Sequence, residues 1–432
     1  MSNNNVKINV NHITRVEGHG NITIDVSNGE LKECKLHVVE APRFFEAMLK
    51  GRHYNDVGLI VCRICGICSA GHMLASLKAS EDAFGITISD QERKLRMLLN
   101  CGEFFESHVL HVYFLAVPDF VGAKSVLPLV NTHKDTVIQA LKLKKLGHDI
   151  GNIIGGRLIH SISMNVKAVS KVPTKKELEE IISRLKDAKK EIAIGANILK
   201  TLKIPDFERE TEYISLYKPG EYTFLEGSIF SSDSGETSYK NYRETTNEYL
   251  VDHSTAKRAK HKRNSYMVGA LARFNNNNQW LSDDAKQMAH DLGLKAPCYN
   301  PYMITVAQFV ELVHMADDSI KTAEELLNMN LEVEDRTFPL KAVTGVGAIE
   351  VPRGILFHEY SYNDKGHLEK ANCIIPTGQN LENIENDMRK LTPTILDKTK
   401  EEITLMLEML VRAYDPCISC STHLLDVKFI NA

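Results

Sequence analysis

Two pairs of cysteines are the residues of this 432-residue chain best suited to chemistry. Cys65 and Cys68 form one Cys-x-x-Cys turn, and Cys417 and Cys420 form a second. Each turn lets two thiolates converge on one metal atom, and two turns together supply four sulfur ligands, a set that suits zinc, iron or nickel. The sequence therefore predicts a metal site assembled from segments near both ends of the chain.

The separation of the pairs along the chain bears on the kind of site they form. Structural zinc sites normally use two turns about 12–20 residues apart, whereas 417 − 68 = 349 positions separate these pairs. That separation favours a buried redox or catalytic metal held in a completed core. A structural zinc site and a thiol–disulfide pair stay open as alternatives, although neither pair lies in the strand–helix–strand context of a thioredoxin-like motif.

The residues beside the pairs strengthen the metal interpretation. His72 follows the first pair and His423 follows the second, so each turn has a further metal-binding side chain nearby. Asp415 and Pro416 precede the second pair, and the proline fixes the backbone that enters the turn. The remaining candidates are expected to have roles in the core. The isolated cysteines should be small buried hydrophobic residues; these are Cys34, Cys101 and Cys298. His108 and His111 should belong to a hydrogen-bond network.

The elements that must position these residues are mainly helical. Apolar residues recur at three- and four-residue spacing, and Thr174 with Glu177 forms a capping box that begins one helix. Alternating apolar residues predict strands within the first forty residues, joined by an Asn28-Gly29 turn. We expect helices at 73–84, 91–117, 131–149, 175–200, 303–330 and 380–412, an irregular region at 203–300, and strands and turns at 340–377. The fold class is therefore mainly α with a smaller β portion (α+β).

Composition excludes several classes of protein. A net charge of −4 argues against a nucleic-acid-binding protein, and 43% hydrophobic with 25% charged residues is typical of a folded globular chain. No stretch of about 18 apolar residues predicts a transmembrane helix, and residues 1–10 do not resemble an export signal. Nine cysteines without such a signal indicate reduced thiols and a cytoplasmic location. The basic run 257–263 either covers a surface or docks an acidic partner.

The cysteine segments resemble the two nickel-binding signatures of the large subunit of nickel–iron hydrogenases, R-x-C-G-x-C-x-x-x-H and D-P-C-x-x-C-x-x-H. Both patterns match in full, at residues 63–72 and 415–423. Further segments resemble motifs of that family in the same order, at 15–19, 41–46, 106–108 with 118–119, 351–354 and 375–377. The resemblance covers about residues 10–423 and is closest in style to the alpha subunits of cytosolic NADP-linked or sulfhydrogenase-type enzymes. It implies their fold, a central helical bundle with an N-terminal β-hairpin region.

The resemblance implies a metal centre that splits H2 reversibly into protons and electrons. All four cysteines would hold nickel, and Cys68 with Cys420 would also hold an iron that carries carbon monoxide and cyanide. A magnesium or similar hard ion would be bound by Glu46, His423 and the backbone carbonyl of Cys373.

The resemblance also implies roles for residues around the metals. Cys417 would take a proton from H2, and Glu17 would pass it outward. Arg353 would place its guanidinium over the open face of the metals, held by Asp119 and Asp415.

Three more residues would complete the surroundings of the metals. Thr377, next to Pro376, would donate a hydrogen bond to a cyanide, and His72 would hydrogen-bond a bridging sulfur. A non-catalytic hydrogenase-derived subunit of quinone reductases is an alternative, but that group lacks the cysteine set. A zinc-bound scaffold or assembly protein is a third alternative.

Cofactor-binding motifs that are missing from the sequence indicate which partner proteins the chain needs. Its sequence has no G-x-G-x-x-G dinucleotide fingerprint and no further cysteine cluster for an iron–sulfur centre. The resemblance therefore implies an iron–sulfur small subunit, flavin and iron–sulfur diaphorase-type subunits, and NAD(P) or a similar soluble carrier as acceptor. It also implies nickel-insertion proteins and a maturation endopeptidase that removes residues 424–432, leaving 1–423 as a single domain.

Overall fold

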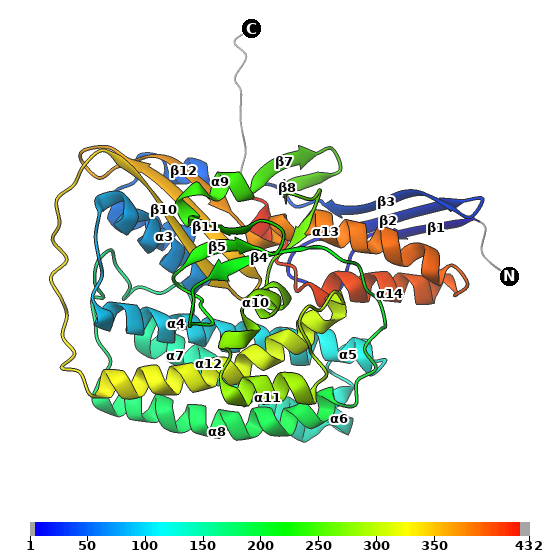
Figure 1. Cartoon of the computed structure of the whole chain (residues 1–432), viewed down its shortest axis with the longest axis horizontal. Helices are drawn as coiled ribbons and strands as arrows, with labels where there is room; N and C mark the ends of the chain where they lie inside the picture. The colour runs from blue at the N-terminus through cyan, green and yellow to red at the C-terminus, as the bar shows by residue number, and fades with distance from the viewer. Residues whose placement is uncertain (1–4, 424–432) are drawn as a thin grey trace, which may run out of the picture.

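Four long helices lie side by side and form the central helical bundle (Figure 1). The computed structural model describes residues 5–423. Ser89 begins the first of the four helices by accepting a hydrogen bond from the Glu92 amide, and Thr174 begins the third through the predicted capping box with Glu177. The helices are α4 (Asp90–Val109), α7 (Lys134–Gly155), α8 (Lys175–Leu199) and α12 (Ile304–Leu327).

Helices α4 and α7 approach each other closely because glycines face each other where they cross. A Cβ atom added at Gly147 would lie 2.5 Å from the carbonyl oxygen of Gly102, and one added at Gly102 would lie 2.9 Å from the carbonyl oxygen of Gly147. Side chains at these positions would force the helices apart. The close crossing matters because α4 carries acidic side chains toward the segment that holds Cys65 and Cys68.

We expect Gly147→Ala to lower the free energy of unfolding by about 1–3 kcal/mol, because the added methyl group overlaps the backbone of α4. Gly151→Ala, one turn further along α7, is the matched control, since its Cβ would lie 3.3 Å from the Leu158 carbonyl oxygen. That control should stay within about 1 kcal/mol of the wild type, because the better helix propensity of alanine offsets the tighter contact. Urea unfolding of both variants measures the difference, and equal stability would contradict the expectation.

Two three-stranded antiparallel sheets flank the metal-binding segments. The N-terminal sheet has the order β1 (Val6–Val10), β2 (Gly20–Ser27) and β3 (Glu30–Val38). The second has the order β10 (Val343–Val351), β11 (Gly354–Tyr362) and β12 (Leu368–Ile374). Helix α3 (Ser69–Phe84) packs on β10 and β11, where Gly345 and Gly347 leave room for its backbone. These contacts bring the start of α3, just after Cys68, next to the β10–β11 turn.

The region 203–300 is more ordered than expected. A four-stranded sheet has the order β6-β5-β4-β9, with β4 (Glu212–Tyr217), β5 (Ser228–Ser231), β6 (Gly235–Thr237) and β9 (Tyr266–Met267). Strands β7 (Asn247–Val251) and β8 (Ser254–Lys260) form a hairpin.

The short α-helices along the chain are α1 (Phe45–Leu49), α2 (Tyr54–Val61), α5 (Val117–Phe120), α6 (Leu129–Thr132), α9 (Tyr242–Thr245), α10 (Ala270–Asn277) and α11 (Asp283–Asp291).

Two expected helices are wrong in their extent. The helix expected over 91–117 leaves α geometry after Val109 and continues as a π-helical segment, Leu110–Ala116, before α5. The helix expected over 380–412 is two helices, α13 (Pro376–Leu391) and α14 (Lys400–Ala413). Pro393 lacks a backbone N–H and lies in the 3₁₀ turn between them, and a capping box of Thr399 with Glu402 begins the second.

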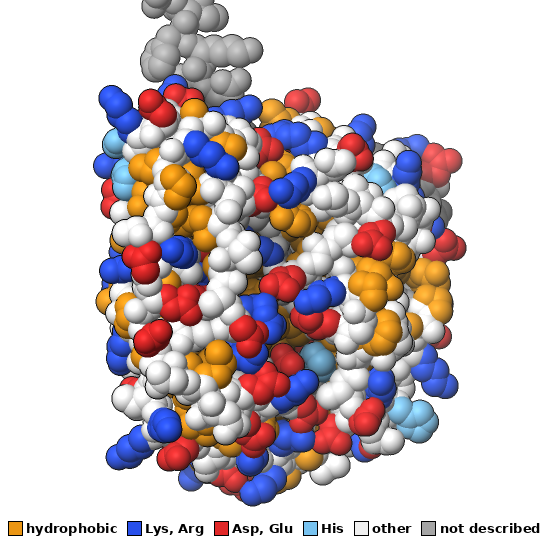
Figure 2. Space-filling view, turned by 60° about the vertical axis from the view of Figure 1, so that its left-hand side comes forward, with side chains coloured by type: hydrophobic (Ala, Val, Ile, Leu, Met, Phe, Trp, Pro, Cys, Tyr) orange, Lys and Arg blue, Asp and Glu red, His pale blue; other side chains and the backbone are white. Residues whose placement is uncertain are grey.

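The surface mixes both signs of charge (Figure 2). Side chains of the basic run 257–263 pair with acidic residues of the same chain: Lys257 with Glu248, Arg258 with Glu382 and Glu385, and Arg263 with Asp233 and Glu210. Arg258 is almost fully buried. These side chains of the basic run therefore form ion pairs within the chain. No helix within residues 5–423 is long and apolar enough to span a bilayer.

Candidate metal centre

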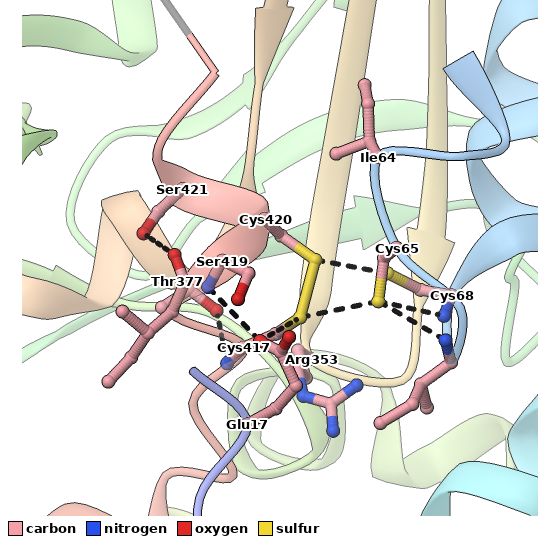
Figure 3. Close-up of a disulfide and its surroundings, with 12 residues drawn as sticks. Glu17, Ile64, Cys65, Cys68, Arg353, Thr377, Cys417, Ser419, Cys420 and Ser421 are labelled. Atoms are coloured by element: carbon pink, nitrogen blue, oxygen red, sulfur yellow. Dashed lines mark hydrogen bonds between the residues drawn. A yellow bond between two sulfur atoms is a disulfide. The ribbon is translucent and has the colours of Figure 1, made fainter. Parts of the chain in front are cut away.

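The two cysteine pairs come together in the folded chain, although 352 positions separate their members (Figure 3). All four cysteines are buried, and their Sγ atoms lie within 4.8 Å of one another. Cys65 Sγ lies 3.4 Å from Cys417 Sγ, and Cys68 Sγ lies 3.7 Å from Cys420 Sγ. Cys417 and Cys420 are joined as a disulfide in this structure. Reduction of that bond gives the four thiolates that a metal requires.

The first pair lies in the turn between α2 and α3, and backbone amides support its sulfur. The amides of Ile67 and Cys68 donate to Cys65 Sγ over 3.3 and 3.4 Å. A hydrogen bond from the Cys68 thiol lowers the pKa of Cys65, and the positive charge of Arg353 acts in the same direction. Cys65 is therefore prepared to be a thiolate, the form that binds metals.

Glu17 approaches the second pair from the segment between β1 and β2. Its Oε2 accepts from the amide of Ser419 over 3.1 Å and lies 3.1 Å from Cys417 Sγ, which can donate to it once the disulfide is reduced, while its carbonyl oxygen accepts from the amide of Ile418. The next residue must be glycine, because Gly18 has φ +87° and a Cβ there would lie 2.7 Å from Ile418 Cβ. The Cys417 thiol thus has a carboxylate in position to receive its proton.

Arg353 lies in the turn between β10 and β11 and points toward the sulfur atoms (Figure 3). Its Nε donates to the carbonyl oxygen of Asp415 over 2.6 Å, and its Nη2 donates to Asp415 Oδ1 over 2.8 Å. Burial works against the charged guanidinium, yet the Asp415 carboxylate raises the pKa of Arg353, so the side chain stays a cation. Arg353 Nη1 is buried without a hydrogen-bond partner among the described residues.

These observations test whether a metal with acceptor ligands fits the site. Four buried sulfur atoms form a ligand set for nickel, and the orphaned donor of Arg353 is the kind of group that an acceptor such as a metal-bound cyanide would satisfy. Thr377, the residue after Pro376 at the start of α13, uses its hydroxyl oxygen to accept from the Cys417 amide over 3.0 Å, which leaves its proton free for another acceptor. The residues present therefore fit the group.

Asp119 does not have the partner that we expected. It pairs with Arg412 over 2.7 and 2.9 Å and with Arg15, whereas Arg353 pairs with Asp415. The reason is its place on α5, next to the end of α14 and to the segment that leads to Glu17. Asp119 thus fixes two backbone segments of the site and does not hold the guanidinium over it.

His72 also has an unexpected partner. Its Nδ1 lies 3.1 Å from His358 Nε2, and His358 Nδ1 lies 2.5 Å from the Tyr360 hydroxyl, so no sulfur atom is its hydrogen-bond partner here. Burial lowers the pKa of both histidines, which are therefore neutral. Sequence reasoning missed His358, whose only signal is a histidine inside an apolar strand. His108 and His111 join core contacts, with Glu311 and with Gln308 and the Arg412 carbonyl oxygen.

Glu46, His423 and Cys373 meet as a separate polar cluster. His423 Nδ1 lies 2.9 Å from Glu46 Oε2, and the amide of Cys373 donates to Glu46 Oε1 over 3.2 Å. Burial opposes ionisation of Glu46, but the charge of His423 and its hydrogen bond lower the pKa of this carboxyl. An ionised carboxylate and an imidazole together can hold a cation. Cys34 and Cys101 are fully buried as expected, whereas Cys298 is partly exposed.

Comparisons with known proteins agree with this geometry. The family described as nickel-dependent hydrogenase matches residues 43–149 and 165–423, and a HoxL-like family matches residues 7–41. The alpha chain of sulfhydrogenase 1 of Pyrococcus furiosus is 35% identical over 428 residues, which cover 98% of this chain and 99% of the relative. The alpha chain of sulfhydrogenase 2 of the same organism is 33% identical over 417 residues, with 96% and 98% covered. A crystal structure of NAD+-reducing [NiFe]-hydrogenase in the H2-reduced state superposes with a TM-score of 0.89 at 25% identity, covering 97% of this chain and 99% of the other.

Proposed function

Because this chain belongs to the nickel-dependent hydrogenase family, as a catalytic large subunit with a four-cysteine cluster, we propose that it carries out reversible heterolysis of H2 at a nickel–iron centre. All four cysteines would hold nickel, and Cys68 and Cys420 would also hold iron with its carbon monoxide and cyanide. When bound, the metal pair supplies the electrophile that polarises H2 and accepts its two electrons. The observation that carries the proposal is the group of four buried sulfur atoms with a carboxylate on one of them.

The chain's own residues handle the proton. Cys417 Sγ receives a proton as the H–H bond breaks, and Glu17 Oε2, 3.1 Å away, takes it next. Glu17 is partly exposed, so the proton that it carries is close to solvent. The Ser419 amide keeps the carboxylate aimed at the sulfur through both protonation states, because it donates to the same oxygen.

Arg353 supplies a fixed positive charge and a free donor. Asp415 holds two of its nitrogen atoms, so the third faces the metal ligands without having to reorganise. Thr377 adds a hydroxyl donor from the start of α13. Both side chains orient the acceptor ligands of the iron and stabilise the negative charge that they carry.

Arg353→Lys should lower H2 turnover by about 10²–10³-fold at unchanged nickel content, because an ammonium group cannot keep both Asp415 contacts and still present a donor to the metals. Arg243→Lys is the control, since Arg243 is exposed and pairs with Glu359 far along the chain from the cysteine turns. Turnover near the wild-type rate in Arg353→Lys would show that the guanidinium has no part in the reaction.

We further propose a hard cation, magnesium or one like it, at Glu46, His423 and Cys373. The lowered pKa of Glu46 supports this, because the carboxylate is available as a charged ligand. In this structure the Cys373 amide faces Glu46, so the proposed ligand is its carbonyl oxygen. The site would tie the residues just after Cys420 to α1.

The electrons leave through partners in this proposal. An iron–sulfur small subunit receives them, and diaphorase-type flavin and iron–sulfur subunits pass them to NAD(P) in the cytoplasm. Support comes from the relatives, which include the alpha chain of a sulfhydrogenase and an NAD+-reducing enzyme. Nickel-insertion proteins and an endopeptidase would complete maturation of the domain 1–423. The predicted removal of 424–432 lies outside the described residues.

The test is metal content and mass of the chain, measured on the complex purified from its host, together with H2-dependent reduction of a viologen dye and of NADP. About one nickel per chain with dye reduction supports the proposal. Zinc without nickel, and no dye reduction in a chain that ends at His423, would indicate a structural zinc site instead. Dye reduction without NADP reduction would retain the hydrogenase and reject the proposed carrier.

A further inference from the structure

Glu103 is a buried carboxyl group for which the mechanism above has no use. It lies on α4, is 5% exposed, and accepts a hydrogen bond from the amide of Gly71 at Oε2 over 3.0 Å. Its Oε1 is buried with no hydrogen-bond partner among the described residues. Gly71 is the third residue after Cys68, so this carboxyl group lies on the side of the first cysteine pair, whereas Glu17 contacts Cys417 of the second pair.

A small polar cavity adjoins this carboxyl group. Its volume is about 10 Å³, which is room for about one water molecule. The walls come from the start of α3, from α4 and α7 at their glycine crossing, and from the segment that follows α7. They include Ile67, Ser69, Glu103, Glu106 and Ser161. A buried acid with an open oxygen, beside a cavity of this size, is the setting in which an internal water carries protons.

A second acid lies between this cavity and partly exposed side chains of α7. Glu106 lies one helical turn beyond Glu103 and lines the same cavity. Its Oε1 lies 2.7 Å from His148 Nε2 and 3.2 Å from Lys144 Nζ, both on α7. The side chain of His148 is 24% exposed. Ionisable groups therefore follow one another from the cysteine turn to solvent.

We propose that Glu103 is a second proton-transfer group of this centre, serving a route through a cavity water, Glu106 and His148. The proposal rests on the proposed function, because H2 oxidation releases two protons for each molecule. One proton leaves through Cys417 and Glu17. The other reaches Glu103 on the side of the first cysteine pair, and the Glu103 carboxyl group passes a proton through the cavity water to Glu106, which passes one on to His148. No electron moves in these steps.

The electrostatic surroundings of Glu103 agree with this role. Burial raises the pKa of its carboxyl group to about 8, and the negative charges of Cys65 and Glu106 act in the same direction, against the Gly71 amide. A carboxyl group with a pKa near neutrality exchanges a proton at little cost in either direction.

The experiment compares Glu103→Gln with Glu92→Gln in the assembled, nickel-loaded complex. Glu92 is a matched control because it also lies buried on α4, accepts from one amide (Val169, 3.0 Å) and has one oxygen without a partner. The first measurement is infrared: the C=O stretching component of the protonated Glu103 carboxyl group, shifted in D2O, should be lost in E103Q and kept in E92Q. The second is H2 turnover, which should fall roughly tenfold in E103Q and stay at the wild-type rate in E92Q.

A double variant separates the two routes. Because a proton blocked at Glu17 can leave only by way of Glu103, E17Q keeps a residual rate, and E17Q/E103Q loses most of that rate at unchanged nickel content. E106Q provides the same test if E103Q does not fold. Equal rates for E17Q and E17Q/E103Q, or an unchanged carboxylic-acid band in E103Q, would overturn the second route and leave the hydrogenase standing. A nickel-loaded wild type without H2 turnover would instead reject the proposed function, whatever the infrared band shows.

Discussion

Cys417→Ser should abolish both nickel retention and H2 turnover while leaving the chain folded. The hydroxyl keeps the donor to Glu17 but is a far poorer ligand for a soft metal than a thiolate, and it cannot take up the proton at neutral pH. The loss of turnover should exceed about 10³-fold, because the same atom holds the metal and receives the proton. The free energy of unfolding should change by less than about 1 kcal/mol, since the two side chains have nearly the same shape.

Nickel per chain, dye reduction by H2 and urea unfolding measure these three effects. Cys298→Ser is the control, because Cys298 is partly exposed and stands apart from the four sulfur atoms. Unfolding of Cys417→Ser under conditions in which Cys298→Ser is folded would point to a structural metal instead. Retention of a full nickel complement would remove Cys417 from the ligand set.

Glu17→Gln should lower H2 turnover by about 10²–10⁴-fold at unchanged nickel content, which makes it the second largest effect. The amide side chain still accepts from Ser419 but has no basic oxygen to receive the Cys417 proton. The rate that remains should be the part carried by Glu103. Exchange of D2 with solvent protons should be slowed with turnover, since both need the proton to leave.

Glu33→Gln is the matching control for Glu17→Gln. Glu33 is partly exposed on β3 and pairs with Lys35, so its substitution should leave turnover at the wild-type rate. Glu17→Asp gives a further check, because it keeps the acid and shortens its reach. Partial recovery of the rate in Glu17→Asp relative to Glu17→Gln would assign the effect to the carboxyl group, and a wild-type rate in Glu17→Gln would contradict the proposed proton path.

A structural feature is predicted well from the sequence when the residues that specify it lie close together along the chain. The capping box at Thr174, the hairpin at Asn28 and the cysteine turns are each defined within a few residues, and each has its predicted form. The split between α13 and α14 also has a local signal in Pro393, although the prediction gives a single helix over 380–412. Caps and turns that are specified within a few residues can therefore be predicted from the sequence.

The prediction is wrong where the partner of a side chain lies far away in the sequence. Asp119 and Asp415 are both acids next to a predicted arginine site, and only the packing of α5 against α14 decides that Arg412 and Arg15 take the first. His358 pairs with His72 across 286 positions. Such pairs depend on the relative placement of α3 and β11, and no pattern within either segment specifies that placement.

The arrangement of the cysteines has a consequence for biosynthesis. Corresponding cysteines of the two pairs are 352 positions apart, so at about 5–20 residues per second the second pair leaves the ribosome roughly 20–70 s after the first. Throughout that interval Cys65 and Cys68 form half a ligand set, and two thiolates alone bind zinc or copper at least as well as nickel. The cysteines therefore cannot discriminate between metals until the second pair has been synthesised. Until then, the nascent chain avoids the wrong metal only if the cell keeps the concentrations of competing free ions low.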